Sequence, residues 1–336
     1  MTLQWILLIS MLVAILIAAE LFTNALEHFG ERVGISAGVT GSIFAAVATA
    51  LPETSIPLIA LFAGTDNKLV NQEIGVGAIL GAPLMLSTLS TFLMALSVIN
   101  QRGIKGRLRP EKTGLARDLN FFLIAFILAA TAMYMPLHPH YLRVLTSLIL
   151  VGLYVIYLIL TCKASKALVA QGHGVETEAP LLITKLKLKN NLFTIWIQLI
   201  LGLVILVAGA KGFIHGIKNV SQALGISALL LSLLIIPIAT ELPEKVNSIL
   251  WVRKKKDTLG FGNITGAMVF QGTLLPAIGI LLTPWQPLHV VETGIFITLA
   301  AAAWLRLNVS EQGPRIMALF LNGALYLLYL YFTLIH

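Results

Sequence analysis

Charged residues and cysteine are both scarce in this sequence. Asp, Glu, Lys and Arg together supply 11% of the 336 residues, whereas 57% are hydrophobic. Soluble domains usually contain about 25% charged residues, so the composition excludes an ordinary soluble domain. The single cysteine, Cys162, excludes an intramolecular disulfide framework and a cysteine-based zinc site. Apolar runs reach the length of about 20 residues that a bilayer-spanning helix needs, and they predict a polytopic membrane protein.

Signals for enzymes and for nucleic-acid binding are also missing. The sequence contains no His-Glu-x-x-His zinc motif, and we expect neither an enzyme nor a cofactor. The net charge of +8 does not indicate nucleic acid, because the basic residues lie in loops beside hydrophobic runs. Such loops meet anionic headgroups, so the expected partner is the lipid bilayer. Nothing in the sequence indicates a protein partner.

Hydrophobic runs bounded by glycine, proline and charge clusters predict ten transmembrane helices. Their approximate limits are 3–27, 33–63, 71–98, 119–136, 141–162, 192–217, 222–251, 258–283, 287–304 and 315–335. The longest connecting segment divides them into two sets of five. We therefore predict a first five-helix repeat over 1–162, a cytosolic linker over 163–191 and a second repeat over 192–336.

The distribution of basic residues predicts the orientation in the membrane. Most of the 23 Lys and Arg residues fall in loops on one side of the predicted helices, and this side is the cytosolic one. Both termini are then outside. We expect an integral protein of the plasma (inner) membrane.

The two halves of the chain contain matching motifs in the same order. Three motifs of the first half, Gly34-Ile35-Ser36, Leu51-Pro52-Glu53 and Gly77-x-x-x-Gly81, align with Gly225-Ile226-Ser227, Leu242-Pro243-Glu244 and Gly262-x-x-x-Gly266. Because each half has an odd number of helices, the two copies have opposite orientations, which is the inverted-repeat plan of secondary transporters. The paired glycines predict close packing of helix 3 on helix 2 and of helix 8 on helix 7.

Glu53 and Glu244 lie inside hydrophobic spans, each directly after a proline. A carboxylate at the bilayer centre costs several kcal/mol, so each is a candidate functional group. Proline lacks an N–H and leaves the carbonyl four residues earlier without its helical partner. The freed carbonyls are those of Ala48 and Ala239. We predict that helices 2 and 7 are broken at these points and line a site.

A threonine stands four residues before each of these carboxylates. Thr49 and Thr240 therefore share a helix face with Glu53 and Glu244, respectively. Hydroxyl, carbonyl and carboxylate groups are all oxygen ligands, which hard cations such as calcium prefer. A single Pro-Glu is usually a kink with a satisfied carboxylate, but a symmetric pair favours a cation site.

The blocks GSIFAAVATALPETS and LIIPIATELPEKVNS, each followed by a Gly-x-x-x-Gly segment, resemble the two α-repeats of the cation/calcium exchanger superfamily. This superfamily includes sodium/calcium and proton/calcium antiporters, and the resemblance extends over residues 18–98 and 209–283. It implies that Glu53 and Glu244 are the central cation ligands. It also implies that Thr49 and Thr240 contribute to the site.

The sequence departs from the superfamily pattern beside these motifs. The usual serines are replaced at four positions, by Ala50, Glu241, Ala82 and Ala267. Leu86 and Gln271 stand where sodium/calcium exchangers carry Asn or Asp. Side chains for several sodium sites are therefore missing, while the oxygens suffice for one divalent ion.

The second repeat contains polar residues that the first lacks. Glu241 precedes Glu244 by three residues on the same face, so it can join the site as a further carboxylate and carry a proton. Asn263 and Gln271 are further candidate ligands. Two interpretations remain open for Lys245, which is either an ion-pair partner of the acidic cluster or a tethered cation that replaces a bound sodium ion.

These patterns predict an antiporter that exchanges Ca²⁺, or a similar divalent cation, against H⁺ or Na⁺ by alternating access. A Mg²⁺ transporter of the same fold is an alternative, because magnesium retains water and needs fewer protein oxygens. A non-transporting scaffold or sensor is another, since Lys245 can satisfy Glu244 permanently.

Overall fold

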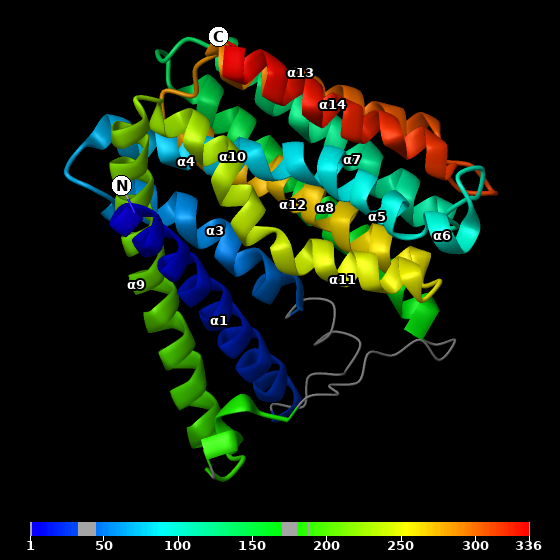
Figure 1. Cartoon of the computed structure of the whole chain (residues 1–336), viewed down its shortest axis with the longest axis horizontal. Coiled ribbons are helices and arrows are strands. Elements are labelled where there is room, and N and C mark those ends of the chain that lie inside the picture. Colours follow the sequence, from blue (N-terminus) through cyan, green and yellow to red (C-terminus); the bar gives the residue numbers. More distant parts are fainter. Residues whose placement is uncertain (1, 33–44, 170–179, 187, 336) are drawn as a thin grey trace. The chain divides into compact units, whose positions relative to one another are not determined.

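The computed structural model describes residues 2–32, 45–169, 180–186 and 188–335, and nearly all of them are helical (Figure 1). Within these ranges there is no β-strand, and an isolated bridge joins Arg107 and Arg315. The predicted all-α class is confirmed. Eight helical stretches in the described ranges are long and apolar enough to cross a membrane, and Glu53–Ala63 and Ala228–Ile238 are shorter apolar helices.

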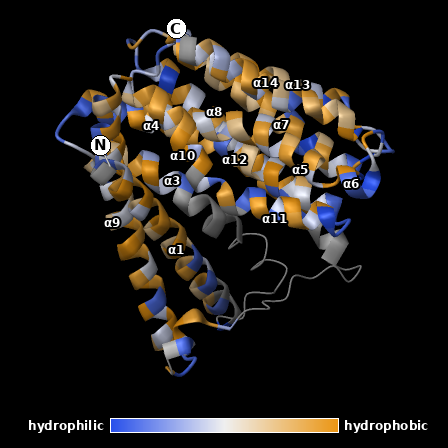
Figure 2. Ribbon diagram, in the orientation of Figure 1, coloured by the Kyte–Doolittle hydropathy of each residue, from blue (hydrophilic) through white to orange (hydrophobic). Residues whose placement is uncertain are grey.

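The helical elements follow one another in this order. They are α1 (Thr2–Arg32), α3 (Ala45–Ala63), α4 (Lys68–Met85), the π-helical turn η2 (Leu86–Ser90), α5 (Thr91–Ser97), α6 (Ile99–Arg102), α7 (Lys112–Thr131), the 3-10 turn η3 (Ala132–Tyr134), α8 (Tyr141–Val169), the 3-10 turn η4 (Leu182–Leu186), α9 (Leu192–Leu224), α10 (Ala228–Thr240), α11 (Leu242–Arg253), α12 (Asp257–Leu282), α13 (His289–Leu307) and α14 (Ile316–Ile335). Hydrophobic residues cover most of the helices, and hydrophilic residues gather at their ends and in the loops (Figure 2).

The largest extensions beyond the predicted limits are found in three helices. α9 continues past residue 217, because nothing interrupts it before Gly225, whose left-handed backbone (φ 69°) ends the helix. α7 begins before residue 119, since the side chain of Glu111 caps its first turn. α8 runs past residue 162 into the predicted linker. Polar segments that were predicted to be loops thus continue the helices where no glycine or proline ends them.

The break predicted in helix 2 is not found, whereas that in helix 7 is. α3 is continuous through the Leu51-Pro52-Glu53 segment, and residues 33–44 of predicted helix 2 lie outside the described part of the chain. A proline removes one backbone hydrogen bond, but the turns on either side of Pro52 retain helical geometry. In the second half, α10 ends at Thr240 and α11 begins at Leu242.

The chain divides into two compact units. Unit 1 comprises Met1–Ile74 and Leu158–Ala228, and unit 2 comprises Gly75–Tyr157 and Leu229–His336. In unit 1, α1 packs along α9, and α3 packs against both (Figure 1). Glycine permits this approach, because a Cβ on Gly202 of α9 would lie 3.0 Å from the backbone N of Phe22.

Two amide side chains fasten η4 to the helices of unit 1. The N–H of Leu182 donates to Oδ1 of Asn24 at 2.9 Å, and the N–H of Ile183 donates to Oε1 of Gln198 at 2.8 Å. Gln198 also donates from Nε2 to Oδ1 of Asn24 at 3.0 Å. These bonds anchor the end of the predicted linker to α1 and α9.

In unit 2, the first Gly-x-x-x-Gly segment packs on α10. A Cβ on Gly77 would lie 2.6 Å from Cβ of Ser232, and a Cβ on Gly81 would lie 2.4 Å from the carbonyl oxygen of Leu233. The prediction that these two glycines pack on helix 2 is therefore wrong, because their nearest neighbours lie in α10. They bring α4 against the first half of broken helix 7.

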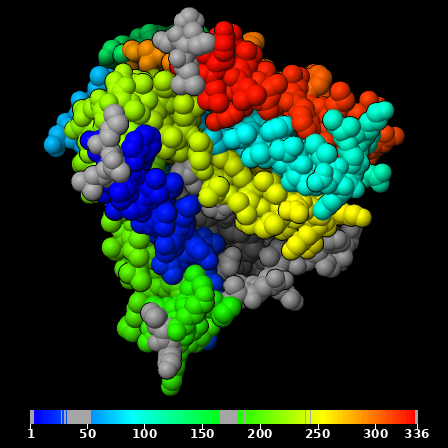
Figure 3. All heavy atoms as spheres, in the orientation of Figure 1, coloured from blue at the N-terminus to red at the C-terminus, as the bar shows by residue number. Residues whose placement is uncertain are grey.

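The second Gly-x-x-x-Gly segment does not pack in the predicted way. A Cβ on Gly262 would have no neighbour within 4 Å, and a Cβ on Gly266 would meet the hydroxyl of Tyr157 at 3.6 Å. α12 approaches α11 through Gly260 instead, where a Cβ would lie 3.0 Å from the carbonyl of Ser248. In the space-filling view, α11 (yellow) also lies beside α5 (cyan), with which it is in contact (Figure 3).

Loops that are distant in sequence meet at one end of unit 2. Asp257, at the start of α12, forms an ion pair with Arg102 at 2.6 Å and accepts the N–H of Arg109 at 2.6 Å. Lys112 pairs with Glu311 at 2.7 Å. All of these loops belong to the side that the basic residues predict to be cytosolic.

Arg143 organises the opposite end of unit 2. Its buried guanidinium donates to the carbonyls of Ile280, Thr283 and Pro284 at 2.8 to 3.0 Å. Ile280 lies in the last turn of α12, and Thr283 and Pro284 directly follow the helix, where a positive charge is favourable. α8 and α12 are therefore tied together at the end away from Asp257.

The glycine contacts predict a difference between two matched substitutions. We expect Gly81→Ala to lower the thermal unfolding midpoint in detergent, because the new Cβ meets backbone and overpacking costs about 1–3 kcal/mol. Gly262→Ala is the control, since its Cβ enters open space and alanine favours a helix by up to about 1 kcal/mol. Equal midpoints for the two variants would contradict the close packing of α4 on α10.

Candidate cation site

The junction between α10 and α11 is built around Glu241. Its backbone leaves the helical region (φ −85°, ψ 2°), and its N–H donates to the carbonyl of Pro237 at 3.2 Å. Pro243, at the start of α11, has no N–H to offer to the preceding turn. The C-terminal end of α10 and the N-terminal end of α11 thus meet at one point. The former attracts cations and the latter stabilises carboxylates.

Glu241 and Gln271, both predicted ligands, are brought together here. Both side chains are fully buried, and Nε2 of Gln271 donates to Oε1 of Glu241 at 2.9 Å. α12 carries Gln271 to this point because it packs along α11. The bond joins two polar groups that the second repeat has and the first lacks.

Glu244 lies in the first turn of α11 and is 3% exposed. One of its carboxylate oxygens lies within 4.8 Å of a carboxylate oxygen of Glu241. Its Oε2 has no hydrogen-bond partner within the described part of the chain. Two carboxylates this close repel one another unless a cation or a proton lies between them. The pair is therefore suited to bind a cation.

Asn263 and Thr240 support the pair from two sides. Nδ2 of Asn263 donates to the carbonyl of Glu244 at 3.1 Å and to Oγ of Ser248 at 3.0 Å, so this amide holds α12 to α11. Thr240 is buried at the end of α10, and its hydroxyl donates to the carbonyl of Ile236 at 3.2 Å. Its oxygen keeps lone pairs for a cation.

Lys245 is also buried, at 6% exposure. Its Nζ donates to the carbonyl of Pro237 at 3.0 Å and to Sδ of Met85 at 2.6 Å. Sequence reasoning missed both Met85 and the Pro237 carbonyl. A proline at position 237 frees the carbonyl of Leu233 rather than its own, so the sequence carried no signal for this contact.

The predicted ligands of the first repeat belong to unit 1. Glu53 lies in α3 and is 5% exposed, so its carboxylate is buried as expected of a functional group. Thr49 and Ala48 lie in the same helix, and their side chains are outside the described part of the structure, as is the side chain of Ala239 in α10. Burial of Glu53 agrees with the prediction, and its role stays a prediction.

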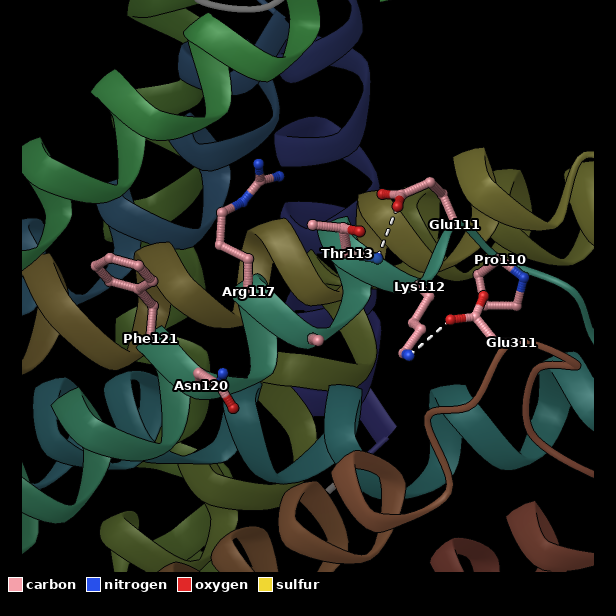
Figure 4. Close-up of a pocket in the computed structure, with 9 residues that line it drawn as sticks. Pro110, Glu111, Lys112, Thr113, Arg117, Asn120, Phe121 and Glu311 are labelled. Atoms are coloured by element: carbon pink, nitrogen blue, oxygen red, sulfur yellow. Dashed lines mark hydrogen bonds and ion pairs between the residues drawn. The ribbon is translucent and has the colours of Figure 1, made fainter.

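A pocket of about 760 Å³ lies at the start of α7, and none of the predicted ligands lines it (Figure 4). Lys112 and Glu311 form an ion pair across it, and Arg117 and Phe121 line it further along α7. Partial burial opposes ionisation of Glu111, but hydrogen bonds from the N–H groups of the first turn lower its pKa. The carboxylate of Glu111 therefore serves as the N-cap of α7.

The chain is similar to known proteins along most of its length. The family model described as sodium/calcium exchanger protein matches residues 3–163 and 194–335. The inner membrane protein YrbG of Escherichia coli is 25% identical over 333 residues, which are 96% of this chain and 94% of that protein. The matched family consists of exchangers, which are transporters and not enzymes.

Two solved structures have a similar fold. The H⁺/Ca²⁺ exchanger CAX matches with a TM-score of 0.73 and 20% identity, covering 98% of this chain and 82% of that chain. The sodium-calcium exchanger NCX_Mj matches with a TM-score of 0.57 and 20% identity, covering 98% of both chains. At this identity the likeness concerns the fold alone.

The bond between Gln271 and Glu241 generates a prediction. We expect Gln271→Leu to lower the unfolding midpoint and to reduce the midpoint rise that calcium produces, since a hydrogen bond to a charged group contributes about 1.5–3 kcal/mol. Gln198→Leu is the matched control, because it removes buried amide bonds in unit 1. This control should lower the midpoint but leave the calcium effect intact. A calcium effect that is unchanged in Gln271→Leu would exclude Gln271 from the site.

Proposed function

Because the chain belongs to the sodium/calcium exchanger protein family, we propose that it is a secondary-active antiporter of inorganic cations. Its cargo is calcium or a similar divalent cation, which moves against protons or sodium by alternating access. One observation carries this proposal. Glu241 and Glu244 are buried at a helix break with carboxylate oxygens within 4.8 Å of one another, which is a hard-cation environment inside a membrane protein.

The proposed site combines both repeats. Glu53 and Glu244 supply the central carboxylates, and Glu241 and Gln271 add oxygens from the second repeat. The remaining ligands are the hydroxyls of Thr49 and Thr240, the carbonyls of Ala48 and Ala239, and Asn263 as a supporting amide. Burial of both central carboxylates supports this assignment.

The proposed topology is ten helices in two inverted repeats, 1–162 and 192–336, joined by a cytosolic linker over 163–191. Both termini are outside, in a plasma (inner) membrane. Three loops predicted to be cytosolic meet at one end of unit 2, through Arg102, Lys112 and Asp257, as this topology requires. The resemblance to an inner membrane protein supports the location.

Magnesium is the second candidate cargo. The amide nitrogen of Asn263 donates to the carbonyl of Glu244 and to Oγ of Ser248 in α11, so this side chain can offer a cation only Oδ1. Magnesium keeps several of its waters and needs fewer protein ligands than calcium. A non-transporting scaffold or sensor is the third hypothesis, and under it no cation flux is expected.

Flux into proteoliposomes tests the proposal. We expect a proton or sodium gradient to drive calcium uptake by the wild type, and we expect Glu53→Gln and Glu244→Gln each to reduce uptake. Losing about 1.4 kcal/mol of cation binding alone gives a ten-fold reduction. Manganese and magnesium in place of calcium distinguish the cargoes.

Glu311→Gln serves as the control, because Glu311 is exposed and lies in the pocket at the start of α7. Its uptake should match the wild type. The proposal fails if neither gradient moves any divalent cation, or if the double variant Glu53→Gln/Glu244→Gln transports normally.

A further inference from the structure

Lys245 is a positive charge buried beside a proposed cation site. It follows Glu244 directly on α11 and is 6% exposed. An ammonium group in a membrane interior costs several kcal/mol unless it is paired, so it is retained for a structural or functional reason. The position of its nitrogen indicates which reason applies.

The ammonium lies at the C-terminal end of α10. Nζ donates to the carbonyl of Pro237 at 3.0 Å, and the same carbonyl accepts the N–H of Glu241. In transporters with broken helices, the carbonyls at the end of a half-helix are the groups that coordinate a monovalent cation. The negative end of the helix dipole adds to the attraction. Lys245 thus occupies a place that would suit a sodium ion.

The second contact favours an ammonium over a metal ion. Met85 of α4 presents its sulfur to Nζ. A thioether is a soft, weak ligand that a hard cation such as sodium avoids, whereas it accepts a hydrogen bond from an N–H donor. Gly81 brings α4 close to α10 and so places Met85, one turn later, against the helix break.

Charge balance gives the consequence. The proposed site holds three carboxylates, those of Glu53, Glu241 and Glu244, and Lys245 reduces their combined charge from −3 to −2. One divalent cation neutralises this charge, so no place remains for an additional monovalent ion. Without the lysine, one divalent and one monovalent cation are needed.

We infer that Lys245 is a specificity-determining residue whose tethered ammonium takes the place of a coupling sodium ion and excludes sodium from the site. The inference rests on the proposed function for the identity of the site. Sodium then neither binds to the wild type nor drives its divalent flux. Removal of the lysine charge creates a sodium site between the Pro237 carbonyl and the carboxylates.

Thermal unfolding of the purified full-length protein tests this directly. Sodium chloride and choline chloride are compared at equal ionic strength. We expect equal midpoints for the wild type, and for Lys245→Met a midpoint higher in sodium by on the order of 3 °C, as a newly bound ligand produces. Lys245→Arg keeps the charge and should behave as the wild type.

Lys211→Met is the matched control, because it removes an exposed lysine from α9 of unit 1 and should gain no sodium effect. The wild-type comparison needs no variant, so poor folding of Lys245→Met leaves the test decisive. A sodium-specific midpoint rise in the wild type, or none in folded Lys245→Met, overturns the inference. Because unfolding requires no transport, this failure is distinct from a failure of the proposed function, which absence of flux reveals.

In proteoliposomes, sodium provides the second readout. We expect an imposed sodium gradient to leave calcium uptake by the wild type unchanged, and to raise uptake by Lys245→Met about ten-fold, which corresponds to about 1.4 kcal/mol of sodium binding. Sodium-driven uptake by the wild type overturns the assignment of Lys245 while it supports exchange itself.

Discussion

Two carboxylates, those of Glu241 and Glu244, are buried where one apolar helix is interrupted, and burying a charge costs several kcal/mol unless it is compensated. The fold provides part of that compensation. Gln271 donates to Glu241, the N-terminal end of α11 favours negative charge, and the ammonium of Lys245 lies on the adjoining carbonyl of α10. The remaining negative charge is compensated when a cation or a proton binds. The uncompensated charge of the pair therefore favours cation binding.

The remainder of unit 2 holds this helix break in place. Asn263 ties α12 to the backbone of Glu244, and the contact of α4 with α10 through Gly77 and Gly81 sets the other side. The ion pair between Asp257 and Arg102 fixes the start of α12, and Arg143 caps its far end. α12, which carries Asn263 and Gln271, is thus secured at both ends.

Apolar run length and the Pro-Glu motifs were sufficient to predict the all-α class, most helices, the break in helix 7 and the burial of Glu53, Glu241 and Glu244. Helix limits were less predictable, because a capping Glu111 and a left-handed Gly225 decide them locally. The partners of the glycine segments and of Lys245 depend on which helices lie side by side, and periodicity along one helix carries no such information. Met85 shows this plainly, since its contact with Lys245 joins residues that are distant in the sequence.

Calcium binding to the purified protein and its single variants tests the central claim most directly, namely that both repeats contribute to one divalent-cation site. The account predicts one calcium ion per chain, and it predicts that Glu53→Gln and Glu244→Gln each abolish or strongly weaken this binding while Glu311→Gln does not. Undiminished calcium binding by Glu53→Gln, with loss only in Glu244→Gln, would contradict a site shared by the two repeats.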